Sequence, residues 1–136
     1  MKNRNKIIYW ISTALLATAM LQSGTIQLFK IRGALYDVTA MARLGYPVYF
    51  LTILGIWKML GVVALLIPKF PLVKEWAYAG FFFTLSGAAV SHIAVGDPAR
   101  EWSISLFLLS MTILSWYFRP ATRRINLPER GIRVPA

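Results

Sequence analysis

One lysine in this chain occupies a position where a charged side chain is costly. Lys58 lies near the middle of residues 46–67, which are otherwise apolar almost throughout. An ionisable side chain at the centre of a bilayer costs about 2.5–3.5 kcal/mol on insertion scales. Such a group needs a polar partner, a wet cavity or a ligand. The lysine can hold an anionic or carbonyl-bearing ligand or handle protons, or it can be a structural residue that snorkels or hydrogen-bonds within the bundle.

Further polar residues occur in or beside the apolar runs. At 1.5 Å per helical residue, Gln22 lies roughly 10 Å, His92 roughly 5 Å and Lys58 roughly 17 Å below the same membrane boundary. We therefore predict a shared polar cavity for these three, with Ser91 beside it and Asp97 on the loop at its mouth. The alternatives are a hydrogen bond across helices for Gln22, an interfacial place for His92 rather than a proton relay, and a turn rather than a lid at Asp97.

The residue types that are missing exclude several chemistries for this chain alone. There is no cysteine, which excludes thiolate catalysis, disulfide exchange and iron–sulfur ligation. With His92 as the single histidine, a two-histidine haem or metal site can form only between subunits. No pair of carboxylates, Ser–His–Asp set or phosphate-binding glycine loop is present. We predict no metal site, and we do not expect catalysis by this chain on its own.

Four apolar runs must position these residues. They cover about residues 7–29, 46–67, 76–95 and 102–118, and aromatic residues lie near their ends. Hydrophobic residues make up 57% of the 136 residues and charged ones 15%, with a mean hydropathy of +0.58. This composition predicts a single domain over 1–136, an all-α integral membrane four-helix bundle of up-down-up-down order.

Two segments allow more than one interpretation. The start of the first run also resembles a signal peptide, with Ala17-Thr18-Ala19 as a cleavage pattern, but the apolar character continues to Phe29 and favours a retained helix. Residues 30–45 carry a moderate helical stripe of apolar residues, which fits either a short amphipathic helix at the interface or an extension of the first helix. The stripe consists of Ile31, Leu35, Val38 and Leu44, with Ala42. Gly45-Tyr46-Pro47 then starts the second run, and we expect residues 68–74 to form a tight turn before the third.

The positive charges predict the orientation in the membrane. The net charge is +10, and ten Lys and Arg residues fall in the N-terminus, the 68–75 link and the tail 119–136, against four in the 30–45 segment and the 96–101 loop. Positive charge favours the cytoplasmic side, so both termini and the basic tail are expected there. Because the basic residues flank apolar runs, we expect them to meet the lipid bilayer rather than nucleic acid.

Small residues at steps of three or four predict how the helices meet. In the third run these are Ala77, Gly80, Thr84, Gly87 and Ser91, and the first run repeats the pattern with Thr13, Ala17, Met20, Gly24 and Gln27. Helices in lipid associate through such faces, so we expect both to form seams of the bundle. A pore is the alternative.

The second and third runs resemble a known family. The carrying features are Gly45-Tyr46-Pro47, Gly55-x-x-Lys58-x-x-Gly61 and Pro68, then Glu75-Trp76-Ala77-Tyr78-Ala79-Gly80, Gly87-Ala88, Ser91-His92 and Gly96-Asp97. Together they resemble the DoxX-like family of small four-helix bacterial membrane proteins, which implies the bacterial inner membrane. By this resemblance the positions to watch are Lys58, Glu75, Ser91, His92 and Asp97.

The resemblance implies a class of function more than a reaction. Relatives in the wider DoxX and DoxD group are similar to membrane subunits of thiosulfate:quinone oxidoreductase, and others are linked to oxidative-stress complexes. A thiol-handling role does not carry over, because the chain lacks cysteine. We therefore expect a redox-associated membrane subunit that binds a quinone-like or other lipophilic molecule. The alternatives are a structural or assembly subunit without a ligand and a small transporter, which would need a homo-oligomer to enclose a path.

Overall fold

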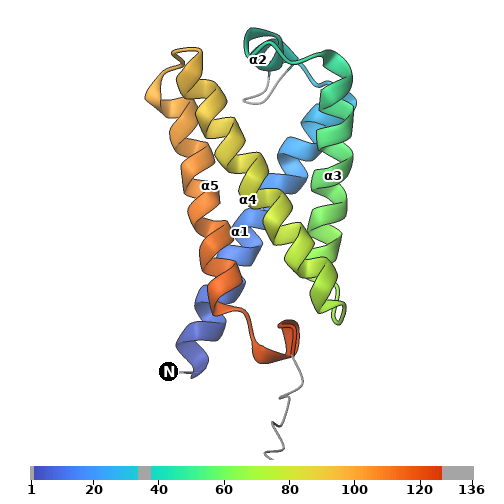
Figure 1. Ribbon diagram of the computed structural model, residues 1–136, viewed down its shortest axis with the longest axis vertical. Coiled ribbons are helices and arrows are strands. Elements are labelled where there is room, and N and C mark those ends of the chain that lie inside the picture. Colours follow the sequence, from blue (N-terminus) through green and yellow to red (C-terminus); the bar gives the residue numbers. More distant parts are fainter. Residues whose placement is uncertain (1, 34–37, 127–136) are drawn as a thin grey trace, which may run out of the picture.

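The computed structural model describes residues 2–33 and 38–126, and all regular structure in that part of the chain is helical (Figure 1). The four long helices are α1 (Lys2–Phe29), α3 (Val48–Leu66), α4 (Pro71–Ala94) and α5 (Ala99–Phe118). A short helix, α2 (Val38–Arg43), precedes α3, and a 3₁₀ turn, η1 (Ala121–Arg123), follows α5. The predicted all-α fold is confirmed.

The long helices run alternately in opposite directions (Figure 1). The start of α1, the α3–α4 link and η1 lie at one end, which we call the terminal end. Helix α2 and the α4–α5 link lie at the other end, which we call the cavity end. Helix α1 packs against α3 and α5, and α4 packs against the same two helices. The predicted up-down-up-down order therefore matches the arrangement.

Three of the described helices, α1, α3 and α4, are long and apolar enough to cross a membrane, judged by length and composition. Helix α5 has 20 residues but starts with Arg100 and Glu101 and carries several hydroxyl side chains. A fourth crossing by α5 therefore stays a prediction, as does the side of the membrane on which the termini lie.

The helix ends follow from glycine and proline. Gly45 has a φ of 81°, and Pro47 is the N-cap of α3. Helix α4 starts at Pro71, five residues before the predicted Trp76, so the expected turn over residues 68–74 is wrong in its second half. Proline suits the first helical position, where its missing N–H is not needed. The reversal is instead made by Lys69 and Phe70, which both have left-handed φ values.

The segment between α1 and α3 is not an extension of the first helix. Helix α1 ends at Phe29, and Lys30 has a φ of 53°. The separate helix α2 follows, as in the first of the two interpretations, while its position at a membrane interface stays a prediction. Leu35 and the Val38 side chain of the expected apolar stripe lie outside the described residues, Ile31 is exposed, and Leu44 is half-buried.

Two glycines allow the helices to come together closely. A Cβ at Gly55 of α3 would lie 2.9 Å from the carbonyl oxygen of Gly24 on α1, and one at Gly61 would lie 2.6 Å from the Phe81 ring of α4. Both glycines belong to the Gly-x-x-Lys-x-x-Gly pattern. The pattern therefore has a packing role on both sides of Lys58.

The small-residue seam holds for α1 but not for α4. On α1, Thr13, Ala17, Met20, Gly24 and Gln27 are all buried. On α4 the buried residues are instead Lys74, Tyr78, Phe81, Leu85 and Ala89, all of which except Ala89 have large side chains. The predicted seam on α4 is wrong, because Gly80 and Gly87 are exposed and a Cβ at either would meet nothing within 4 Å.

Candidate ligand-binding cavity

A cavity of about 340 Å³ opens between the long helices below α2; we call it the lysine cavity. All five α-helices contribute to it. Its apolar walls include Met20, Met41, Phe50, Phe83, Leu85 and Leu108. Its polar side chains are Ser23, Gln27, Tyr46, Lys58, Thr84, Ser91, His92 and Ser105. Thr84, Gly87 and Ser91 belong to the small-residue face of α4 that was expected to pack against another helix. They line this cavity instead.

The glycine contact between α1 and α3 positions Lys58. A Cβ at Gly24 would lie 3.2 Å from the Lys58 Cβ, so the lysine stem passes directly over the backbone of α1. Its Nζ then donates a hydrogen bond to the Ser23 hydroxyl at 3.1 Å. The side chain is only 8% exposed. Among the described residues, the hydroxyl of Ser23 is therefore the one side-chain acceptor that compensates for the burial of the ammonium.

Lys58 and Gln27 both retain hydrogen-bonding capacity toward the cavity. An ammonium has three donors, and the structure gives Lys58 one side-chain acceptor, Ser23, among the described residues. Gln27 is 4% exposed, and its Oε1 has no hydrogen-bond partner in the described part of the chain. Buried polar groups are nearly always satisfied, so two such groups lining one cavity indicate space for a polar ligand group or water.

At the mouth of the cavity, polar contacts join segments that are far apart in the sequence. The Tyr46 hydroxyl lies 2.8 Å from the Ser91 hydroxyl. His92 Nδ1 lies 2.6 Å from a carboxylate oxygen of Asp97, and Arg43 Nε lies 3.3 Å from the other oxygen. Asp97 therefore ties α2 to the end of α4 and also lies in the turn after Gly96, whose φ is 75°.

Only some of the residues predicted from the sequence line the lysine cavity. Lys58, Ser91 and His92 line the cavity. Asp97 contacts His92 but does not itself line the cavity. Gln22 is exposed and absent from the lining, so its predicted convergence with Lys58 is wrong. Its place is taken by Ser23 and Gln27, which both lie on the buried face of α1. Gln27 belongs to the small-residue face expected for the first run, and Ser23 lies beside that face outside the expected set.

Glu75, the remaining position marked by the resemblance, lies at the terminal end of the bundle. It forms an ion pair with Arg119 and accepts a hydrogen bond from Trp116 Nε1 at 2.9 Å. The Arg119 guanidinium stacks over the rings of Tyr78 and Trp116, at 5.7 and 5.1 Å from their centroids. Glu75 therefore joins α4 to α5 and has no part in the lysine cavity.

A second buried lysine, Lys74, contrasts with Lys58. It is 1% exposed, and its Nζ donates to the carbonyl oxygens of Ala64 at 2.8 Å, Leu65 at 3.2 Å and Ile67. These carbonyls end α3, where they have no partner within the helix and where a cation meets the negative end of the helix dipole. In the sequence, Lys74 was interpreted only as one of the positive charges that predict the orientation in the membrane.

Hydroxyl groups connect three helices beside Lys74. The Ser115 hydroxyl of α5 lies 2.7 Å from both Thr13 Oγ1 of α1 and the Tyr78 hydroxyl of α4. Arg123 of η1 donates to the Tyr9 hydroxyl at 3.2 Å and to the Leu65 carbonyl at 2.8 Å. These hydroxyls are paired with side chains of neighbouring helices, whereas in the lysine cavity Gln27 Oε1 has no partner and Lys58 has one side-chain acceptor among the described residues.

The geometry defines what the lysine cavity can recognise. A ligand would place apolar surface against the Met, Phe and Leu walls, and an acceptor oxygen within reach of Lys58 Nζ. The amide of Gln27 can donate or accept beside it. This arrangement suits a lipophilic molecule with a carbonyl or anionic group.

Comparison with known proteins places the chain in a family. The profile of the DoxX-like family matches residues 11–115, which cover α1 through most of α5 and include every polar residue of the cavity. No curated protein and no solved structure matches the chain. With more than half of its residues matched to that profile, the chain belongs to the DoxX-like family.

Proposed function

We propose that this DoxX-like membrane protein binds a lipophilic molecule bearing a carbonyl or anionic oxygen, such as a quinone, in the lysine cavity. We further propose that it does so as the membrane subunit of a redox system rather than as an enzyme on its own. The observation that carries the proposal is Lys58, a buried ammonium with spare donors in the wall of an otherwise apolar cavity.

The size and lining of the cavity support a small ring with a lipophilic tail. Its volume of about 340 Å³ falls in the usual range for small-molecule sites, about 300–1,000 Å³. Such sites combine apolar walls with a few placed polar groups. Lys58 and Gln27 are those groups here, and Phe50 and Phe83 provide aromatic faces for a ring.

The floor of the cavity favours binding over transport through one chain. Leu16, Val62, Leu65, Tyr78 and Phe81 belong to one buried cluster beyond the cavity on the way to the terminal end. A packed layer of this kind makes the cavity a blind pocket. A structural subunit without a ligand would not require such a pocket, because the hydrogen bonds at the terminal end already join the helices.

We place the protein across the membrane with four helices, α5 included, and with both termini on the cytoplasmic side of a bacterial inner membrane. Helix α5 packs along α1 and α4, and its 20 residues suffice for about 30 Å of hydrocarbon at 1.5 Å per residue. The distribution of Lys and Arg supports the orientation.

Binding is tested with the full chain in a neutral detergent. We expect decylubiquinone to raise the thermal unfolding temperature and to give a saturable heat of binding, while decylbenzene, which has the tail but no carbonyl, does neither. Lys58→Met should weaken decylubiquinone binding about tenfold or more, because a charged hydrogen bond contributes about 1.5–3 kcal/mol.

The matched control is Lys69→Met, which removes an exposed lysine from the α3–α4 link. It should bind decylubiquinone like the unmodified chain. Equal binding by the Lys58→Met variant, or equal stabilisation by decylubiquinone and decylbenzene, would overturn the proposed role of Lys58.

A further inference from the structure

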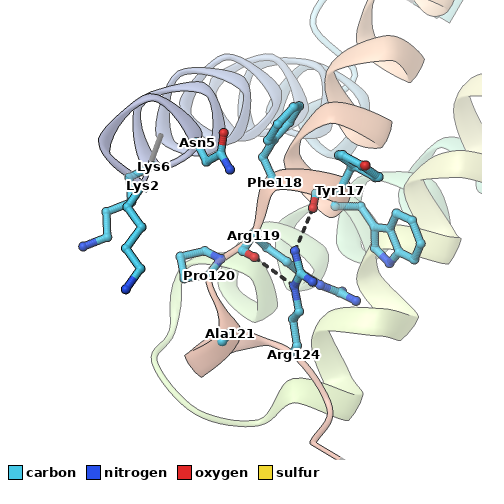
Figure 2. A pocket seen from close by; sticks show the side chains of 10 residues that line it. Lys2, Asn5, Lys6, Tyr117, Phe118, Arg119, Pro120, Ala121 and Arg124 are labelled. Atoms are coloured by element: carbon cyan, nitrogen blue, oxygen red, sulfur yellow. Dashed lines mark hydrogen bonds between the residues drawn. The ribbon is translucent and has the colours of Figure 1, made fainter.

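A second pocket, of about 660 Å³, lies at the terminal end between the start of α1 and the end of α5 (Figure 2). We call it the basic pocket. It is lined by Lys2, Asn5, Lys6, residues 116–121 and Arg124. None of these residues is acidic, and four carry a positive charge: Lys2, Lys6, Arg119 and Arg124. Such a concentration of charge in a concave site attracts an anion.

The helix geometry and two internal hydrogen bonds hold the charges in place. Lys2 and Lys6 are four residues apart on α1 and therefore share one face of the helix, and Figure 2 shows both side chains extending from the start of α1. Arg124 folds back onto the end of α5, donating from Nε to the Arg119 carbonyl at 3.0 Å and from Nη2 to the Tyr117 carbonyl at 2.9 Å. The opening of the pocket is therefore partly preorganised.

The positive charges are only partly compensated within the described residues. Glu75 is the carboxylate paired with this group, through Arg119. Arg119 is 8% exposed, and its Nε and Nη1 have no hydrogen-bond partner in the part of the chain that the structure describes. The pocket thus retains an excess of positive charge.

The aromatic side chains beside the charges point to a lipid. Trp116 and Tyr117 line the pocket and are 45% and 64% exposed. In the placement proposed above, in which α5 crosses the membrane, such residues at its end lie at the depth of the lipid headgroups. Basic pockets between membrane helices at this level bind phosphate-bearing headgroups. We propose that the basic pocket binds the phosphate of an anionic lipid headgroup, independently of any ligand in the lysine cavity.

The test measures lipid retention by the full chain. Protein in a neutral detergent is titrated with phosphatidylglycerol or phosphatidylcholine, and bound lipid is counted by native mass spectrometry. We expect phosphatidylglycerol to bind in preference. The double variant Lys2→Gln/Lys6→Gln should weaken its binding about twenty-five-fold, taking about fivefold for each basic residue. The control Lys30→Gln/Lys69→Gln removes the same charge from exposed positions outside the pocket and should keep the preference.

Other outcomes overturn the proposal. Equal weakening in both double variants would mean that net charge, not the pocket, attracts the lipid. Both lipids carry a phosphate, but only the headgroup of phosphatidylglycerol has a net negative charge. Equal binding of the two lipids would therefore mean that the pocket does not select an anionic headgroup. Displacement of phosphatidylglycerol by millimolar inorganic phosphate or glycerol phosphate would make the pocket a site for a soluble anion. Both lysines are exposed, so the variants should keep the unfolding temperature measured without lipid.

Discussion

The two buried lysines of this bundle use their positive charge in opposite ways. Lys74, at the terminal end, donates to three backbone carbonyls at the end of α3. Lys58, at the cavity end, donates to one serine hydroxyl beside about 340 Å³ of space. Burying either ammonium without a partner would be costly. The number of acceptors distinguishes a lysine that braces the fold from one that is available to a ligand.

The same contrast extends to the surroundings of each lysine. Around Lys74, the hydroxyls of Thr13, Tyr78 and Ser115 bond to one another. Around Lys58, Gln27 Oε1 has no partner among the described residues. The hydrogen bonds that join the helices around Lys74 therefore favour stability, and the space and spare donors around Lys58 favour the binding of a lipophilic ligand. Each of the following substitutions tests one side of that division.

The largest effect is expected for Lys74→Met. The carbonyls of Ala64 and Ile67 lose the Lys74 donor, whereas the Leu65 carbonyl keeps its bond from Arg123. Leaving buried acceptors unpaired costs about 1–3 kcal/mol each before relaxation. We expect a net loss of about 3 kcal/mol in the free energy of unfolding, measured by titration with sodium dodecyl sulfate and tryptophan fluorescence. Lys69→Met, in the same link but exposed, should change it by less than about 0.5 kcal/mol. A stable Lys74→Met variant would remove the distinction between the two lysines.

Gly55→Ala should come next, because it disturbs the contact that positions Lys58. The new Cβ would lie 2.9 Å from the Gly24 carbonyl and 3.0 Å from Leu28, so α1 and α3 must move apart. Overpacking of this kind costs about 1–3 kcal/mol. The same unfolding titration measures it, and Gly80→Ala is the matched control because its Cβ would enter open space. If the two glycine variants have the same free energy of unfolding, the close approach at Gly55 does not contribute to stability.

Lys58→Met should act in the opposite direction from Lys74→Met. It removes one hydrogen bond to Ser23 and also the cost of keeping an ammonium in apolar surroundings. We expect the free energy of unfolding without ligand to rise by about 1 kcal/mol, while the stabilisation by decylubiquinone is lost. A clear fall in stability without ligand would instead make Lys58 a second structural lysine.

The sequence was sufficient to predict the helices and their order. Runs of apolar residues predicted four long helices, all of which end within a residue of the predicted ends, and Gly45 and Pro47 marked the start of α3. The start of α4 was misplaced because Pro71 was interpreted as part of a turn, although proline also suits a first helical turn.

The site was harder to predict, because depth in a helix does not determine direction. Gln22 and Ser23 lie at almost the same depth but about 100° apart around α1, so one is exposed and the other contacts Lys58. The buried stripe through Met20, Gly24 and Gln27 contained the correct direction. The role of Lys74 depends on where the α3 carbonyls end in space, which local patterns do not give.

The smallest effect is expected at the mouth of the lysine cavity, from Tyr46→Phe. The hydroxyl lost there bonds to Ser91 at an exposed position, so water or lipid headgroups can replace it, and the free energy of unfolding should change by less than about 0.5 kcal/mol. The contact nevertheless joins the start of α3 to the end of α4 across the opening. We therefore expect faster association and dissociation of decylubiquinone at unchanged affinity, measured by stopped-flow tryptophan fluorescence.

Tyr49→Phe removes an exposed hydroxyl one turn along α3 that does not line the cavity, and it should leave both rates unchanged. Equal rates in the two variants would show that the ligand does not pass between Tyr46 and Ser91.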